Sequence, residues 1–126
     1  MKIIIDDKTS LYEIEEEFRQ RFPFLKIKFL SNTVVSGNNV VSKLIKNKTL
    51  AEYSILSKKD TGVIITSQMT VHDLEQCFEK EYGLVVKVFR NSWRVWLEST
   101  VTDGWTLEEQ NRQGEALSGK NIQNNV

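Results

Sequence analysis

Apolar residues recur with helical spacing in two segments that lie sixty residues apart. Residues 10–22 read SLYEIEEEFRQRF, and residues 70–82 read TVHDLEQCFEKEY. In both segments the apolar positions fall at i, i+3, i+7 and i+11, which is one face of an amphipathic helix. A short aliphatic triplet precedes each segment at the same offset, at residues 3–5 and 63–65. The pattern predicts one strand-then-helix unit that the chain contains twice.

A second repeated signature marks where helices begin. The same four-residue pattern occurs at residues 10–13, 49–52, 70–73 and 106–109. It begins with a hydroxyl residue, continues with an aliphatic residue and any third residue, and ends with an acid. In this arrangement the hydroxyl accepts a hydrogen bond from a free backbone N–H of the first turn, and the acid reaches back to the cap residue. The sequence therefore predicts four helix starts, including a short helix over 50–56 and a last helix after Thr106.

Strand patterns complete each unit. Residues 25–29 alternate strictly, so that Lys26 and Lys28 face water. Residues 85–99 predict a hairpin with its turn at Asn91–Ser92 and with Val95 and Leu97 on the core face. A less regular segment, 40–45, stands where the first copy would have its matching strand, and its alternation does not decide whether it is one.

These elements predict an α+β fold made of two degenerate β-α-β-β-α repeats, over residues 1–61 and 62–117. A 60-residue unit buries too little surface to be stable alone, so the repeats are expected to pack about a pseudo-twofold axis as one domain. A parallel β-α-β step would give mixed sheets. Residues 118–126 are polar and are expected to form a disordered tail.

The predicted hairpin has an outer face that could bind a partner. Five residues share it: Lys87, Phe89, Arg94, Trp96 and Glu98. Aromatic rings interleaved with cations suit a protein contact or the stacking of nucleic-acid bases. Two structural explanations stand beside this: the residues form cross-strand pairs that stabilise an outer sheet face, or the other repeat covers them.

Charge adds one further candidate surface. The chain of 126 residues has 17 Lys and Arg and 17 Asp and Glu, which argues against a general nucleic-acid binder. The charge is uneven, however, because residues 26–59 contain seven lysines and the single acid Glu52. These lysines are either a solvated surface or a patch for an anionic partner.

The sequence offers little for catalysis or metal binding. Its one cysteine, Cys77, excludes an internal disulfide, and its one histidine, His72, is too few for a typical zinc site. The two lie five residues apart on a helix and point in different directions, so they do not form a nucleophile pair. Trp105 precedes the cap Thr106 and is expected to form a hydrophobic staple. No catalytic residues, metal or cofactor are predicted.

Residues 88–98, VFRNSWRVWLE, and residues 103–111, DGWTLEEQN, resemble small uncharacterised bacterial proteins that have the same hairpin followed by a helix. The resemblance covers about a quarter of the chain and implies no activity.

The sequence as a whole favours a non-catalytic protein-interaction or regulatory module, with a protein partner or a homodimer bound at the outer hairpin face. The alternative is a nucleic-acid-binding module that uses the 26–59 lysines with the exposed aromatics. No apolar run is long enough to cross a membrane, and a bacterial cytoplasmic location is expected.

Overall fold

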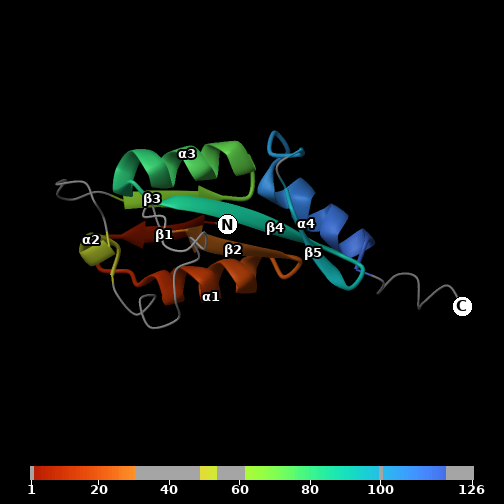
Figure 1. The fold of residues 1–126 in the computed structure, drawn as a ribbon, viewed down its shortest axis with the longest axis horizontal. Coiled ribbons are helices and arrows are strands. Elements are labelled where there is room, and N and C mark those ends of the chain that lie inside the picture. The colour runs from red at the N-terminus through yellow and green to blue at the C-terminus, as the bar shows by residue number, and fades with distance from the viewer. Residues whose placement is uncertain (1, 31–48, 54–61, 100, 119–126) are drawn as a thin grey trace, which may run out of the picture.

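The computed structural model describes residues 2–30, 49–53, 62–99 and 101–118 of the chain (Figure 1). Both helices and strands are present, so the α+β class is confirmed. The elements in chain order are β1 (Lys2–Asp6), α1 (Leu11–Arg21), β2 (Leu25–Leu30), α2 (Leu50–Tyr53), β3 (Gly62–Thr66), α3 (Val71–Tyr82), β4 (Val85–Ser92), β5 (Val95–Glu98) and α4 (Leu107–Ala116). The predicted strand over 40–45 and the predicted tail after residue 118 lie outside the described residues.

All four predicted helix starts are confirmed. The Ser10 hydroxyl accepts from the Glu13 N–H at 3.1 Å, and the Glu13 carboxylate accepts from the Ser10 N–H at 3.4 Å. Thr49 and Glu52 make the same reciprocal pair at 3.3 Å each way. The hydroxyls of the other two caps accept from the third helical residue, Thr70 from Asp73 and Thr106 from Glu109. Local hydrogen bonding therefore fixes each of these boundaries.

The helix starts are also joined in pairs by backbone hydrogen bonds. The Leu50 N–H, at the start of α2, donates to the Thr9 carbonyl at 2.9 Å, just before α1. In the same way the Leu107 N–H, at the start of α4, donates to the Met69 carbonyl at 2.8 Å, just before α3. Each shorter helix is thereby held at the N-terminus of a longer one.

The two long helices end by different means. α1 stops at Phe22, because Pro23 follows and disfavours helical geometry in the residue before it. α3 ends at Gly83, whose φ of 65° lies in the left-handed region that glycine enters without steric cost. Both ends turn the chain into the strand that follows, β2 in one case and β4 in the other.

The strands form two separate antiparallel sheets, β1–β3 and β2–β4–β5. The expectation of a parallel β-α-β step and mixed sheets is therefore wrong for the described residues. The reason is that α1 and α3 each connect strands of different sheets, and that β1 and β2 of the first half pair with β3 and β4 of the second half. In the first sheet Ile4 pairs with Ile64, and in the second Lys28 pairs with Lys87.

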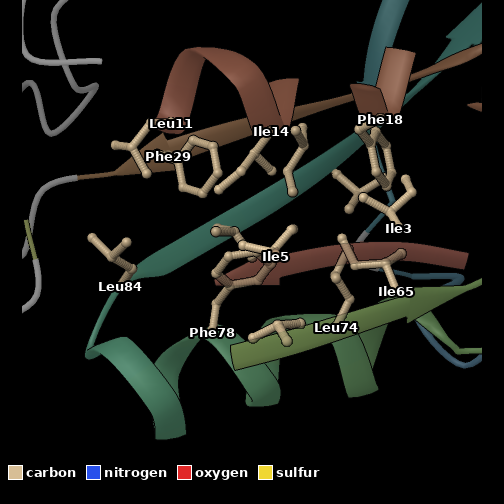
Figure 2. Close-up of a cluster of buried hydrophobic side chains, with 14 of the residues drawn as sticks. Ile3, Ile5, Leu11, Ile14, Phe18, Phe29, Ile65, Leu74, Phe78 and Leu84 are labelled. Carbon is tan, nitrogen blue, oxygen red and sulfur yellow. The ribbon is translucent and has the colours of Figure 1, made fainter. Parts of the chain in front are cut away.

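The core lies between the two sheets and the two long helices (Figures 1 and 2). Figure 2 shows side chains of α1 and α3 directed from opposite sides toward Ile3, Ile5 and Ile65. The Phe29 and Phe78 rings meet edge to face at 5.7 Å between centroids, which joins β2 to α3. The apolar stripes predicted from the sequence are confirmed, because all their residues are buried: Leu11, Ile14, Phe18, Phe22, Val71, Leu74, Phe78 and Tyr82.

The hairpin of the second half forms, but its turn is displaced from the predicted position. β4 continues through Asn91 and Ser92, and the turn falls at Trp93–Arg94, where Trp93 has φ 59°. The strand extends because the Asn91 N–H donates to the Phe24 carbonyl at 2.9 Å, so that pairing with the first half continues past the expected turn. Val95 and Leu97 are 54% and 46% exposed, so their predicted place in the core is wrong. They pair with the end of β4, beyond the part that the core covers.

α4 packs against β4 and the start of β2 through its smallest residue. A Cβ on Gly114 would lie 2.9 Å from both the Cβ and the carbonyl oxygen of Phe24. On the same face of α4, the Asn111 side-chain oxygen accepts from the Phe24 N–H at 2.9 Å. Gln110 is fully buried and donates to the Thr102 carbonyl. This helix is thus held by a close backbone approach and by polar contacts more than by an apolar stripe.

We expect Gly114→Ala to destabilise the fold by about 1–3 kcal/mol, because the added methyl overpacks against backbone that cannot give way. The higher helix propensity of alanine relative to glycine offsets only about 1 kcal/mol of this cost. Urea denaturation measures the difference. Gly104→Ala is the matched control, because a Cβ there meets nothing within 4 Å, and it should change the free energy of unfolding by less than about 0.5 kcal/mol. Equal effects of the two substitutions would contradict this account of α4 packing.

Candidate functional site

The candidate site is the face of the β2–β4–β5 sheet that points away from the core, called here the outer sheet face. Side chains alternate across a strand, so residues opposite one another in the ladder share a face. Phe89 of β4 lies between Lys26 of β2 and Glu98 of β5, and Asn91 lies opposite Trp96. On the opposite side of β2 and β4, Ile27, Phe29, Val86 and Val88 point into the core and are buried.

Two lysines of β2 lie over the aromatic rings of the hairpin. The Lys26 Nζ is 4.8 Å from the centroid of the Trp96 ring, and the Lys28 Nζ is 5.3 Å from that of Phe89. Both distances are within the range of a cation–π contact, which stabilises by about 0.5–1 kcal/mol at exposed sites. Neither ring enters the core, and both remain partly exposed. Among the described residues, neither half of the chain buries these two rings.

Four of the five predicted binding residues fall within this ladder, namely Lys87, Phe89, Trp96 and Glu98. Arg94 is exposed in the turn itself, and its guanidinium is 6.0 Å from the centroid of the Trp93 ring. The displaced turn accounts for this, since Arg94 was expected opposite Phe89 and Glu98 occupies that place. Because the displacement of the turn is two residues, the strand positions keep the faces assigned to them from the sequence.

Lys87 lies at the border of the outer sheet face with α3. Its Nζ is 4.0 Å from a carboxylate oxygen of Glu75 on that helix. Burial raises the pKa of Glu75 from its ordinary value, and Lys87 acts in the opposite direction without cancelling this. Asp103 and Glu98 also raise this pKa, so the acids near Glu75 oppose its ionisation. The positive charge of Lys87 is therefore partly offset by Glu75. Lys26 and Lys28, in contrast, have no ion pair with an acid among the described residues.

Asn91 adds an unpaired polar group beside Trp96. Its side-chain oxygen is buried and accepts no hydrogen bond within the described structure. A buried acceptor without a donor costs about 1–3 kcal/mol, so such groups need an explanation. The oxygen is not accessible from the surface, so it provides no contact for a partner in this structure.

A hollow adjoins the outer sheet face where β2 runs beside α1. It has a volume of about 280 Å³ and is lined by Tyr12, Glu15, Glu16, Arg19, Lys26, Ile27 and Lys28. Burial lowers the pKa of Lys26, and the neighbouring charges of Lys28 and Arg19 lower it further. Three cations therefore crowd this side of the sheet.

Sequence reasoning placed Lys26 and Lys28 in water but did not place them beside the aromatics. That neighbourhood depends on the pairing of β2 with β4, which joins segments about sixty residues apart. The available signal was the shared alternation of residues 25–29 and 86–90, which is compatible with pairing but does not specify it.

The remaining candidates for chemistry have structural explanations. His72 is exposed and lies 3.8 Å from an Asp103 carboxylate oxygen. Cys77 packs beside the core, and burial raises the pKa of its thiol, which makes it a poorer nucleophile. Within the described ranges no three His, Cys, Asp or Glu side chains are grouped to hold a metal ion.

Trp105 does not make the predicted hydrophobic staple, because Gln110 occupies the position it would pack against and is polar. Its ring lies instead 5.7 Å from the Arg90 guanidinium. This contact fixes the entry to α4 against β4. Among the helices described, none has the length and apolar character needed to cross a membrane.

Comparison with protein-family models gives no match, and no curated protein or solved structure matches the chain significantly.

Proposed function

We propose that this protein is a non-catalytic interaction module that binds a partner protein through the outer sheet face. The observation that carries the proposal is the pair of partly exposed rings, Phe89 and Trp96, each with a lysine over it. Large aromatic side chains, tryptophan above all, contribute much of the binding energy at protein interfaces.

The charge of the surface favours a partner with acidic groups. Lys26, Lys28 and Arg94 contribute positive charge, and Glu98 contributes one negative charge. Like charges held near one another on a surface are stabilised when an oppositely charged partner approaches. A second copy of this chain would bring the same cations together, so an acidic partner protein fits better than a homodimer.

We also propose that the two halves, residues 1–61 and 62–117, are copies of one unit packed about a pseudo-twofold axis. Ile4 pairs with Ile64 at a separation of sixty residues, as a twofold axis through that pair requires. The backbone bonds from Leu50 to Thr9 and from Leu107 to Met69 join equivalent helix starts within each half. Under this proposal the second half diverged to contribute the aromatics, while the first contributed the lysines.

A nucleic-acid-binding module is the second candidate function. The observation that favours it is that two lysines of the basic 26–59 segment lie against the hairpin aromatics. Single-stranded nucleic acids are bound by such surfaces through stacking on the rings and contacts to phosphates. Against it, the rings already have lysines over them, and the whole chain has no net charge.

Replacing both Phe89 and Trp96 with serine should remove partner binding and leave the fold intact, because neither ring is part of the core. The loss expected for removing two interface aromatics is at least about a hundredfold in affinity. Affinity capture followed by a quantitative binding assay on the purified partner measures this, and circular dichroism checks the fold. Ile4→Ser is the matched control, since it removes an exposed apolar side chain from the other sheet. Partner binding that survives the double substitution would contradict the proposal.

Titration of fluorescently labelled RNA and DNA at a low and a moderate salt concentration separates the two functions. Protein binding through this face predicts no saturable association with either nucleic acid at low salt. Nucleic-acid binding predicts an affinity that falls steeply as salt increases, because each phosphate contact releases counterions. It also predicts that Lys26→Glu with Lys28→Glu abolishes the association. That pair of results would replace the proposed function with the second candidate.

A further inference from the structure

The strand β5 is the last strand of the β2–β4–β5 sheet and is exposed to solvent along its length. Val95 is 54% exposed and Leu97 is 46% exposed, and Glu98 is also exposed. The other edge strand of this sheet, β2, differs because Ile27 and Phe29 are buried as whole residues. The open edge of the sheet is therefore the one that β5 forms.

Backbone hydrogen bonds show which residues of β5 direct their polar groups outward. The Ser99 N–H donates to the Val88 carbonyl at 3.1 Å, so Ser99 directs its backbone toward β4. Alternate residues of an antiparallel strand bond to the same neighbour, so Leu97 does the same. Trp96 and Glu98 therefore direct their N–H and C=O away from β4. Among the described residues no strand pairs with these outward groups.

The edge of β5 has little that would prevent pairing with another chain. Edge strands are commonly protected by lysine or proline residues, which oppose the addition of a further strand. β5 reads VWLE and has neither, whereas β2 has Lys26 and Lys28. Valine and tryptophan also favour extended backbone. β5 is thus suited to accept an added strand, and its short length is the main limit on the strength of that pairing.

The sequence around β5 is complementary to itself when two copies run antiparallel. A register centred on Trp96 places it opposite Trp96 of the second copy, where the outward backbone groups of both can exchange hydrogen bonds. In the same register Arg94 faces Glu98 of the second copy, and Val95 faces Leu97. A twofold axis repeats each of these pairs, so opposite charges meet twice and apolar residues meet twice. No two like charges face one another across this junction.

We propose that β5 pairs antiparallel with β5 of a second copy, so that two β2–β4–β5 sheets join as one continuous sheet in a twofold dimer. This goes beyond the proposed function, because the second copy lies beside the outer sheet face and leaves it open to an acidic partner. Lys26 and Lys28 belong to the strand farthest from the junction, so their charges do not oppose the pairing directly. Because the paired strands are short, we expect a weak dimer with a dissociation constant in the micromolar range.

The test is sedimentation velocity of the full chain from low micromolar to millimolar concentration. Glu98→Arg leaves arginine facing arginine, and Arg94→Glu leaves glutamate facing glutamate, at both ends of the junction. Each substitution should weaken the dimer by about tenfold or more, since two attractive cross-strand pairs become repulsive. Mixing the two variants in equal amounts should restore association as a mixed dimer, because every facing pair then has opposite charges again.

A matched pair of control variants separates this pairing from general attraction between oppositely charged molecules. Glu79→Arg and Lys8→Glu make the same changes of net charge at exposed positions away from β5. Each should keep the dissociation constant of the unsubstituted chain, and their mixture should associate no more tightly than that chain does.

Hydrogen exchange measured by NMR locates the junction. Dimer formation should slow the exchange of the Trp96 and Glu98 amides as the protein concentration rises. A chain that remains monomeric at every concentration would overturn the proposal, as would a dimer that both single substitutions leave unchanged or one that forms without protecting the Trp96 amide. These substitutions leave Phe89 and Trp96 in place, so the edge pairing can fail while the loss of partner binding in their double variant still supports the proposed function.

Discussion

The pairing of β2 with β4 is the interaction on which the rest of the structure depends. It brings together strands from the two halves of the chain, and its register puts Ile27 opposite Val88 and Lys28 opposite Lys87. Because side chains alternate along a strand, this one register directs Ile27, Phe29, Val86 and Val88 into the core and the lysines of both strands to the outer sheet face. A slip by one residue would bury Lys26 and Lys28, at a cost that no nearby acid offsets.

The same pairing produces the outer sheet face, which is proposed to bind a partner. On the outer sheet face it sets Lys26 and Lys28 of the first half against Trp96 and Phe89 of the second. The pairing of β2 with β4 thus forms both the core side of the sheet and its outer face. The proposed binding surface therefore requires both halves of the chain.

The sequence predicted the local features well, because they depend on residues close together in the chain. Helix faces follow from spacing, and helix starts follow from a hydroxyl and an acid three residues apart, so Ser10 and Thr70 were identified as caps. The hairpin turn was misplaced because alternation alone does not distinguish two positions that differ by an even number of residues. What distinguished them was the contact of Asn91 with Phe24, which lies in the other half of the chain.

Strand partners and the composition of the site were the parts that the sequence could not specify. Alternation of residues 25–29 shows which side chains face water, but not which strand lies beside them. The local pattern favoured a parallel step within each half, whereas β1 pairs with β3 and β2 pairs with β4, in each case between the halves. Four of the five predicted site residues nevertheless share the outer sheet face, since a two-residue displacement preserves the face of a strand position.

The register of β2 against β4 can be measured directly by NMR through contacts between Hα protons of facing residues. Such contacts are strong where two opposed residues exchange no hydrogen bonds, as Ile27 and Val88 do in this ladder. The account predicts strong Hα–Hα contacts between Ile27 and Val88 and between Phe29 and Val86. Contacts from Ile27 to Lys87 or Phe89 in their place would show a register shifted by one residue, and would contradict both the core and the outer sheet face described above.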